Sequence, residues 1–246
     1  MSKLVVKNLN HSFGDKTVLK DINFSVEKGE FLSLVGPSGC GKSTLLKILA
    51  NLLQPNEGVI ERNDGDAKKI SKVFQEANLL PWMNVEANVN LPLKLKGIKS
   101  DKAMEWLEKV GLANNAKQYP DELSGGMKMR VALARAMVMD PEVLLLDEPF
   151  GALDEITRQE MGDELIRFRE LSPCTTIFVT HSVAEAVYLS ERVALMSANP
   201  GLITELINIE YPESRSREWR SETNYLSQVS KLSKALQMTM AGGKDE

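Results

Sequence analysis

Apolar residues along the chain form short continuous runs that alternate with stretches of helical period. Four runs lie at residues 31–35 (FLSLV), 143–147 (VLLLD), 176–180 (TIFVT) and 192–196 (RVALM). Continuous apolar runs of this length are typical of strands buried on both faces of a mostly parallel sheet. Amphipathic stretches such as 43–53 (STLLKILANLL) lie between them, and this alternation predicts an α/β core with helices on both faces of the sheet.

The first thirty residues follow a different pattern, in which apolar and polar positions alternate. The alternation covers 4–9 (LVVKNL) and 22–30 (INFSVEKGE), and the last four residues of the second segment have the composition of a turn. Alternation of this kind predicts strands with one buried face. We therefore expect a small antiparallel β region beside the main sheet.

The middle of the chain, about residues 78–139, has almost no strand pattern. Its segment 101–112 (DKAMEWLEKVGL) is amphipathic, with Met104, Leu107 and Val110 on one side. Gly111 is a helix-terminating residue at its end. The sequence therefore predicts an α-helical subdomain inserted into the α/β core.

The predicted organisation is one domain over residues 1–210, which contains this insertion, and a C-terminal helical tail over residues 211–246. The tail has four apolar residues near helical spacing: Leu226, Val229, Leu232 and Leu236. A membrane-lying helix would have more basic flanks. We therefore expect this helix to pack on its own domain.

Composition and charge narrow the class of protein. The chain has 246 residues, of which 43% are hydrophobic and 26% charged, as in a globular protein with a sizeable core. A net charge of −4, from 30 basic and 34 acidic residues, gives no drive toward nucleic acid, so we expect no nucleic-acid partner.

Three further features concern the compartment. No apolar stretch in the sequence reaches the length of a membrane span, and the N-terminal residues lack the apolar centre of a signal peptide. The two cysteines, Cys40 and Cys174, cannot form a disulfide framework. We therefore expect a protein of the reducing cytoplasm, which can still sit on a membrane protein.

The segment 35–46 (VGPSGCGKSTLL) joins a predicted strand to a predicted helix and fits the phosphate-loop pattern G-x-x-x-x-G-K-[ST]. Its glycines allow successive N–H groups to point into one nest, and the following helix adds the positive end of its dipole. Lys42 supplies a cation for the β- and γ-phosphates, and the Ser43 hydroxyl can ligate Mg²⁺. The predicted phosphate-binding residues are Gly36, Pro37, Ser38, Gly39, Cys40, Gly41, Lys42, Ser43 and Thr44.

Two carboxylates follow the predicted strand 143–147, at the sheet edge where ligands of open α/β folds bind. Asp147 suits Mg²⁺, either directly or through water. Glu148 points to the other face of the strand and can orient the attacking water or accept its proton. Together with the phosphate loop, this pair indicates nucleotide hydrolysis.

A second, partial phosphate site is predicted at Ser124, Gly125 and Gly126, which precede a long helical run. The chain has no second lysine loop and no second acidic pair to complete it. One complete and one partial site in the same chain indicate that two copies share each ATP.

These motifs, in this order, resemble the nucleotide-binding subunit of ABC transporters, over about residues 3–210. The resemblance implies a P-loop NTPase core with a mainly parallel sheet, an N-terminal antiparallel β region and an inserted helical subdomain. It also implies a head-to-tail homodimer that binds ATP and Mg²⁺ and hydrolyses ATP. The expected location is the cytoplasmic face of the cell membrane, peripherally bound to integral permease subunits that work with a periplasmic or extracellular substrate-binding protein.

The resemblance also assigns roles to residues that their spacing alone does not explain. Gln75 in KVFQE matches the glutamine that couples Mg²⁺ and water to the permease contact, and Asp154 lies in the loop that crosses the dimer. His181 in VTHS matches the histidine that contacts the γ-phosphate, and Phe13 matches the aromatic residue that stacks on adenine. The implied catalytic residues are Glu148, His181, Lys42 and Gln75, and the implied metal ligands are Ser43, Gln75 and Asp147.

A finer resemblance concerns the transported solute. The family signature, here 123–127 (LSGGM), often ends in Gln, whereas position 127 is Met. Met in this place resembles importers of nitrate, sulfonate and taurine-type solutes, as do 79–97, 149–161 and 198–203. The alternatives are an ABC-type ATPase of an export or lipid-trafficking system and a non-transport ABC ATPase. A chromosome-maintenance ATPase fits less well, because only 49 positions without sustained heptads separate Gln75 from Ser124.

An apolar cluster follows Gln75 in a predicted loop. It consists of Leu79, Leu80, Pro81 and Trp82. Two interpretations remain open: a surface for a permease helix, or a local core under the helical subdomain.

Overall fold

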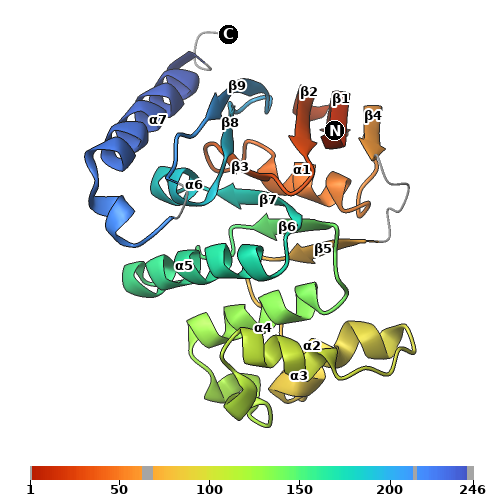
Figure 1. Cartoon of the computed structure of the whole chain (residues 1–246). Coiled ribbons are helices and arrows are strands. Elements are labelled where there is room, and N and C mark those ends of the chain that lie inside the picture. Colours follow the sequence, from red (N-terminus) through yellow and green to blue (C-terminus); the bar gives the residue numbers. More distant parts are fainter. Residues whose placement is uncertain (1, 63–68, 213–214, 243–246) are drawn as a thin grey trace. The chain divides into compact units, whose positions relative to one another are not determined.

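The computed structural model describes residues 2–62, 69–212 and 215–242, and the chain divides into two compact units. The first unit comprises Met1–Lys68 and Cys174–Glu246, and the second comprises Lys69–Pro173. Figure 1 shows the elements coloured along the sequence. Among the helices that the described residues form, none is long and apolar enough to span a bilayer.

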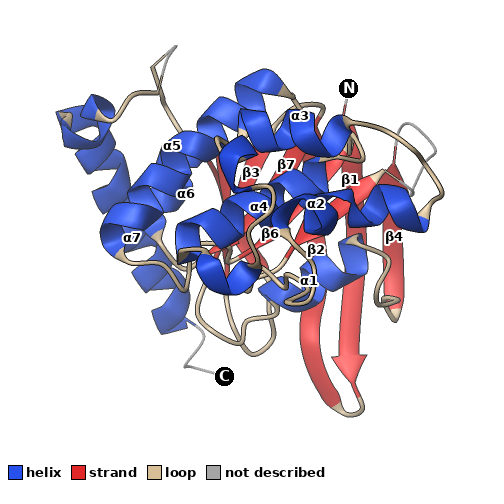
Figure 2. Ribbon diagram, turned by 90° about the horizontal axis from the view of Figure 1, so that it is seen from below, coloured by secondary structure: helices blue, strands red, loops and turns tan. Residues whose placement is uncertain are grey.

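An antiparallel β region begins the first unit, as the alternating pattern predicts. β1 (Ser2–Phe13) pairs with both β2 (Lys16–Glu27) and β4 (Glu57–Arg62), so the strand order is β2-β1-β4. Figure 2 shows β1 and β2 as long neighbouring strands. β1 extends to both sides of the alternating segment 4–9, and β2 begins at Lys16, before the segment 22–30. The added residues pair with each other, from His11 with Leu19 to Phe13 with Lys16.

A mainly parallel sheet forms the core of the first unit and confirms the prediction from the apolar runs. β3 (Phe31–Val35) lies between β7 (Thr175–Thr180) and β8 (Arg192–Met196) and is parallel to both. Every residue of β3 and β7 is buried, which explains why neither sequence alternates. β9 (Ile203–Asn208) adds an antiparallel edge strand to β8.

The helices of this unit are α1 (Lys42–Leu49), α6 (Val183–Leu189) and α7 (Thr223–Gly242), with a 3-10 turn at Glu218–Ser221. α1 is shorter than the predicted helical stretch 43–53. Asn51 adopts a positive φ of 57°, a backbone conformation that commonly ends helices.

The C-terminal helix α7 packs on its own unit, and its buried side agrees with the predicted one at Leu232 but not at Leu226. Tyr225 and Leu232 are buried, whereas Leu226 is 54% exposed. The Tyr225 hydroxyl donates to the Ala184 carbonyl of α6 at 2.9 Å. Of the predicted tail, residues 213–214 and 243–246 lie outside the described residues.

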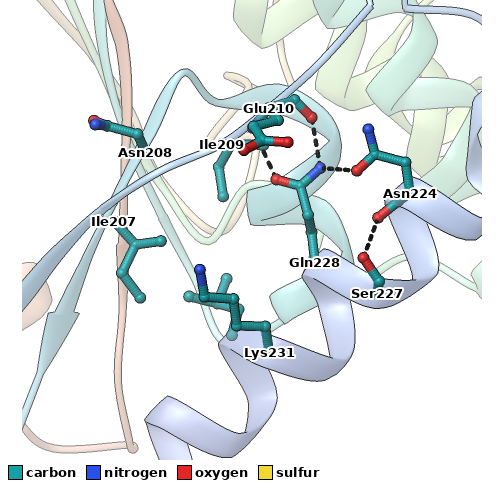
Figure 3. Close-up of a pocket in the computed structure, with 9 residues that line it drawn as sticks. Ile207, Asn208, Ile209, Glu210, Asn224, Ser227, Gln228 and Lys231 are labelled. Carbon is teal, nitrogen blue, oxygen red and sulfur yellow. Dashed lines mark hydrogen bonds between the residues drawn. The ribbon is translucent and has the colours of Figure 1, made fainter.

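A pocket lies between the end of β9, with the residues that follow it, and α7, and Lys231 is among its lining residues (Figure 3). The side-chain amide of Gln228 spans it, because its oxygen accepts from the Glu210 N–H at 2.8 Å and its nitrogen donates to the Glu210 carbonyl. These two bonds hold the first half of α7 against the end of the sheet.

The second unit contains one parallel strand pair and a set of helices. β5 (Ile70–Val73) pairs in parallel with β6 (Val143–Asp147). Between these strands the chain forms helices and irregular segments but no strand, as the sequence predicts for 78–139. The helices are α2 (Val85–Leu95), α3 (Lys102–Lys109), α4 (Gly125–Met137) and α5 (Glu155–Leu171), with 3-10 turns at Ala113–Asn115 and Pro120–Glu122.

The amphipathic segment 101–112 forms α3, and its buried side includes a residue that the prediction left out. Trp106 and Leu107 are buried, while Met104 is half-buried. Gly111 follows the helix with φ +68°, which is the left-handed conformation expected of a glycine at a helix end.

Candidate functional site

The predicted phosphate loop connects β3 to α1, and its backbone requires glycine at Gly41. This residue is the N-cap of α1 and has φ +101°. A Cβ atom there would lie 2.6 Å from Leu19 Cδ2 and 3.2 Å from the Val18 carbonyl. The turn before the helix therefore approaches β2 so closely that no larger residue fits.

Lys42 lies inside this loop rather than in solvent. Its side chain is buried, and its ammonium donates to the carbonyls of Gly36 at 2.8 Å and Pro37 at 3.0 Å. The loop thus holds its cation through two of its own carbonyls at the start of α1, and the beginning of a helix favours a bound anion. The side chain of the neighbouring Cys40 is also buried, and burial raises the pKa of its thiol, so we assign the side chain to packing and the backbone N–H to the predicted loop.

We expect Gly41→Ala to lower the free energy of unfolding by about 2–4 kcal/mol, because it adds both backbone strain and a steric overlap. Gly29→Ala is the matched control, since Gly29 also has positive φ (+77°) but no atom within 4 Å of an added Cβ. Urea unfolding of both variants measures the difference. Equal losses would show that the close approach to Leu19 has no energetic role.

His181 and the phosphate loop leave the same edge of the sheet. Val35 pairs with Thr180 in the parallel register of β3 and β7, so Gly36 and His181 begin adjacent segments. His181 is exposed, and Ser182 caps α6 by accepting from the Glu185 N–H at 3.3 Å. The first unit therefore brings together the two groups that were predicted to contact the γ-phosphate.

Phe13 ends β1 with its side chain 54% exposed, as a ring that stacks on a ligand requires. Its ring meets the ring of His11 edge to face, with centroids 4.7 Å apart and an interplanar angle of 85°. His11, to which the sequence assigns no role, is buried, and neither of its ring nitrogens has a hydrogen-bond partner among the described residues. His11 therefore packs against Phe13 from the same strand, β1.

The second unit brings Gln75, Asp147 and Glu148 to one edge. Val73 pairs with Leu146, so the segments that carry these residues leave the strand pair side by side. Glu148 has a positive φ of 47°, which is uncommon for a residue of its type, and its carbonyl accepts from the Gly151 N–H at 3.0 Å. The turn therefore holds Glu148 in a conformation that the local sequence does not favour.

Asp147 has a cationic neighbour that the sequence analysis missed. Lys72 Nζ lies 2.9 Å from Asp147 Oδ2, and both side chains are buried. The available signal was a lysine in the middle of a short strand pattern, ISKV, where a buried charge needs a partner.

Ser124 begins α4 as its N-cap, and its hydroxyl accepts from the Met127 N–H at 3.3 Å. The two following glycines pack closely on the segment after Glu148. A Cβ on Gly126 would lie 2.8 Å from Thr157 Cγ2, and one on Gly125 would lie 3.2 Å from Leu153 Cδ2. These glycines therefore serve helix packing as well as the predicted anion site.

Asp154 is the exposed N-cap of α5. Its carboxylate accepts from the backbone N–H of Thr157 at 3.0 Å and from its hydroxyl at 2.7 Å. These hydrogen bonds lower the pKa of Asp154, with the backbone bond as the first cause. The cap stabilises the folded state above the ordinary pKa of aspartic acid, and this contribution is lost as the pH falls through the lowered value.

Arg135 ties α4 to the chain just after Gln75. Its guanidinium donates to the carbonyls of Ala77 at 2.6 Å and Asn78 at 2.8 Å. Burial lowers the pKa of Arg135, but an arginine remains charged at neutral pH. Beyond this anchor, Trp82 is 70% exposed, which excludes the local-core interpretation for that side chain.

The predicted site residues fall into two groups. The first unit carries Phe13, the phosphate loop 36–44 and His181, and the second carries Gln75, Ser124, Gly125, Gly126, Asp147, Glu148 and Asp154. Among the described residues, no group of three or more His, Cys, Asp or Glu side chains is arranged to hold a metal ion. The predicted metal ligands Ser43, Gln75 and Asp147 carry a hydroxyl, an amide and a carboxylate oxygen, which are the donor types that Mg²⁺ prefers.

Known proteins are similar to this chain over most of its length. The chain is 50% identical over 222 residues to an aliphatic sulfonates import ATP-binding protein SsuB of Bacillus cereus, covering 87% of this chain and 88% of that protein. It is 48% identical over 211 residues to the aliphatic sulfonates import ATP-binding protein SsuB 1 of Rhodococcus jostii, covering 85% and 83%.

A solved structure supports the fold. The dimeric structure of a post-hydrolysis state of the ATP-binding cassette MJ0796, bound to ADP and Pi, superposes with a TM-score of 0.71 at 33% identity, covering 85% of this chain and all of that one. The family model described as ABC transporter matches residues 19–151, more than half of the sequence. The chain therefore belongs to the ABC transporter family.

Proposed function

We propose that this chain is the ATP-hydrolysing subunit of an ABC importer for a small solute of the nitrate, sulfonate or taurine type. The observation that carries the solute class is the 50% identity to an aliphatic sulfonates import ATP-binding protein over 87% of the chain. The ATPase activity is supported by the phosphate loop and by the paired carboxylates at the edge of β5 and β6.

In this proposal, each copy binds ATP through its first unit. Phe13 stacks on the adenine, and the N–H groups of 36–44 bind the phosphates with help from the α1 dipole. Lys42 exchanges its two carbonyl partners for phosphate oxygens, which are stronger acceptors because they are charged. His181 donates to the γ-phosphate from the adjacent segment.

Mg²⁺, when bound with the triphosphate, supplies positive charge to the phosphate oxygens. The Ser43 hydroxyl, the Gln75 amide oxygen and the Asp147 carboxylate are the oxygen donors that this ion prefers. Glu148 accepts a proton from the attacking water and orients it. Its position in a tight turn fixes the carboxylate relative to the strand end.

The second copy completes the site. Ser124, Gly125 and Gly126 of one protomer cap the γ-phosphate held by the loop of its partner, in a head-to-tail homodimer, with Asp154 in the loop that crosses between them. The dimeric cassettes among the similar structures support this assembly. ATP then favours the closed dimer because it binds that state more tightly than the open one.

The permease partner is proposed to contact the segment after Gln75. Trp82 offers a large apolar surface there, and Arg135 anchors the chain behind it. In this proposal the chain is peripheral, at the cytoplasmic face of the membrane, and the solute is delivered by an extracellular or periplasmic binding protein. The chain itself needs no contact with the solute.

The test is to express the chain with the membrane protein encoded beside it, purify both in detergent and reconstitute them with the solute-binding protein. We expect the two to co-purify and an aliphatic sulfonate to stimulate ATP hydrolysis several-fold over nitrate. Failure of any membrane protein to co-purify would contradict the importer assignment. Stimulation by nitrate alone would retain the importer and change the solute.

A further inference from the structure

Lys72 is a buried cation in the second unit, next to a predicted metal ligand. It lies on β5 opposite Leu145 of β6, and its side chain is 6% exposed. Its ammonium lies 2.9 Å from Asp147 Oδ2 and 4.9 Å from the centre of the Phe74 ring. Within the described ranges, Asp147 is the acidic side chain with which it forms an ion pair.

The pair is held by charge rather than by an aligned hydrogen bond. Lys72 Nζ is inaccessible to solvent and has no hydrogen-bond partner among the residues that the structure describes. A buried ammonium in such surroundings requires the opposite charge beside it, because water cannot solvate it. Lys72 and Asp147 belong to the same unit.

A divalent metal bound at Asp147 would therefore lie close to the ammonium group of Lys72. The ammonium and the metal would both lie within contact distance of one carboxylate, and like charges at that separation repel strongly in a site with little water. The charge of a triphosphate offsets this repulsion, whereas the metal alone has nothing to offset it. The more exposed pair of Lys69 and Glu142 beside the same strands would not repel a metal in this way, because solvent screens its charges.

We propose that Lys72 is the counter-ion of Asp147: it positions and neutralises the carboxylate before nucleotide binds, and it weakens metal binding so that the ion is taken up only with the triphosphate. This inference rests on the proposed role of Asp147 as a metal ligand. Lys72 is a positioning residue, because it acts through Asp147. It would contribute little to the affinity for nucleotide without metal.

The experiment measures binding of Mn²⁺, as a spectroscopic probe for Mg²⁺, to the full chain without nucleotide and with a non-hydrolysable ATP analogue, by electron paramagnetic resonance. We expect Lys72→Met to lower the Mn²⁺ Kd about tenfold without nucleotide, because it removes one adjacent positive charge, and by less with the analogue, whose charge already offsets the repulsion. Lys72→Arg, which keeps the charge, and Lys69→Met, which neutralises the exposed pair, should each stay within about twofold of the original protein.

Thermal unfolding of the same variants without metal separates this role from mere packing. Lys72→Met should lower Tm, because it removes the ammonium that balances a buried carboxylate, and the added change Asp147→Asn should restore it. Lys72→Gln is a second neutral variant that keeps a hydrogen-bond donor, should Lys72→Met fold poorly. A purely structural pair would change Tm and leave the Mn²⁺ Kd as it was.

Two negative results have different meanings. If Asp147→Asn alone leaves the Mn²⁺ Kd unchanged, the proposed metal role of Asp147 is wrong and this inference falls with it. If Asp147→Asn weakens Mn²⁺ binding while folded Lys72→Met and Lys72→Gln bind Mn²⁺ as the original protein does, only the counter-ion role is overturned.

Discussion

The substitution Glu148→Gln is expected to lower the kcat of ATP hydrolysis by about 10²–10⁴-fold while ATP binding persists. The amide keeps the size of the side chain and its place in the turn closed by Gly151, but it cannot accept a proton from water. ATP bound by two copies would then remain intact and hold them together. Phosphate release measures kcat, and size-exclusion chromatography with ATP detects the trapped dimer.

Glu142→Gln is the matched control for this experiment. Glu142 precedes the same strand, and its carboxylate pairs with Lys69 near the surface, away from the strand end that carries Glu148. Its replacement should leave kcat unchanged. Turnover by Glu148→Gln above about a tenth of the original rate would exclude Glu148 as the general base. A monomer at high protein concentration with ATP would instead contradict the shared site.

The second large effect is expected at Ser124. Ser124→Arg places a long charged side chain at the exposed beginning of α4, where the γ-phosphate held by the partner is proposed to lie. Hydrolysis should be eliminated, because the dimer can no longer close around ATP. The ATP affinity of the dilute monomer should change by less than about threefold, since a monomer binds through its own first unit and a threefold change is below about 1 kcal/mol.

Asn84→Arg controls for the loss of a helix cap. Asn84 caps α2 in the same unit by accepting from the Ala87 N–H at 2.8 Å. Losing such a cap costs about 1 kcal/mol of stability in either variant. ATP hydrolysis by purified Asn84→Arg should be close to normal. A large drop in monomer affinity for Ser124→Arg would mean that Ser124 contacts the nucleotide of its own chain.

Strands buried on both faces were the most predictable part of the fold. β3, β6 and β8 begin and end where the apolar runs do, because both faces of such strands are buried and apolar residues therefore occupy most of their positions. β4 and β9 carry half-exposed and exposed residues along their length, so their sequences resemble loops. Pairing with β1 and β8 makes them strands, and a local pattern does not contain that information.

The motifs of the candidate site could be predicted from the sequence, whereas the residues that hold those motifs in place could not. The phosphate loop is recognisable because glycine, lysine and hydroxyl residues must occur there in one order. Lys72 contacts Asp147, which lies 75 positions away in sequence, and Arg135 contacts Asn78, which lies 57 positions away. A local sequence pattern does not contain contacts over such separations. The positive φ of Glu148 is likewise imposed by the turn around it, against its own preference.

Arg135 has a mechanical consequence. Its guanidinium donates to two successive peptide carbonyls just beyond Gln75, and its helix, α4, is capped by Ser124 of the signature. Moving that stretch of backbone without moving α4 would break both bonds and leave the half-buried Arg135 charge without these carbonyl partners. We therefore expect a displacement at Gln75 and a reorientation of the signature residues 123–127 to occur together, as the movement of one rigid body.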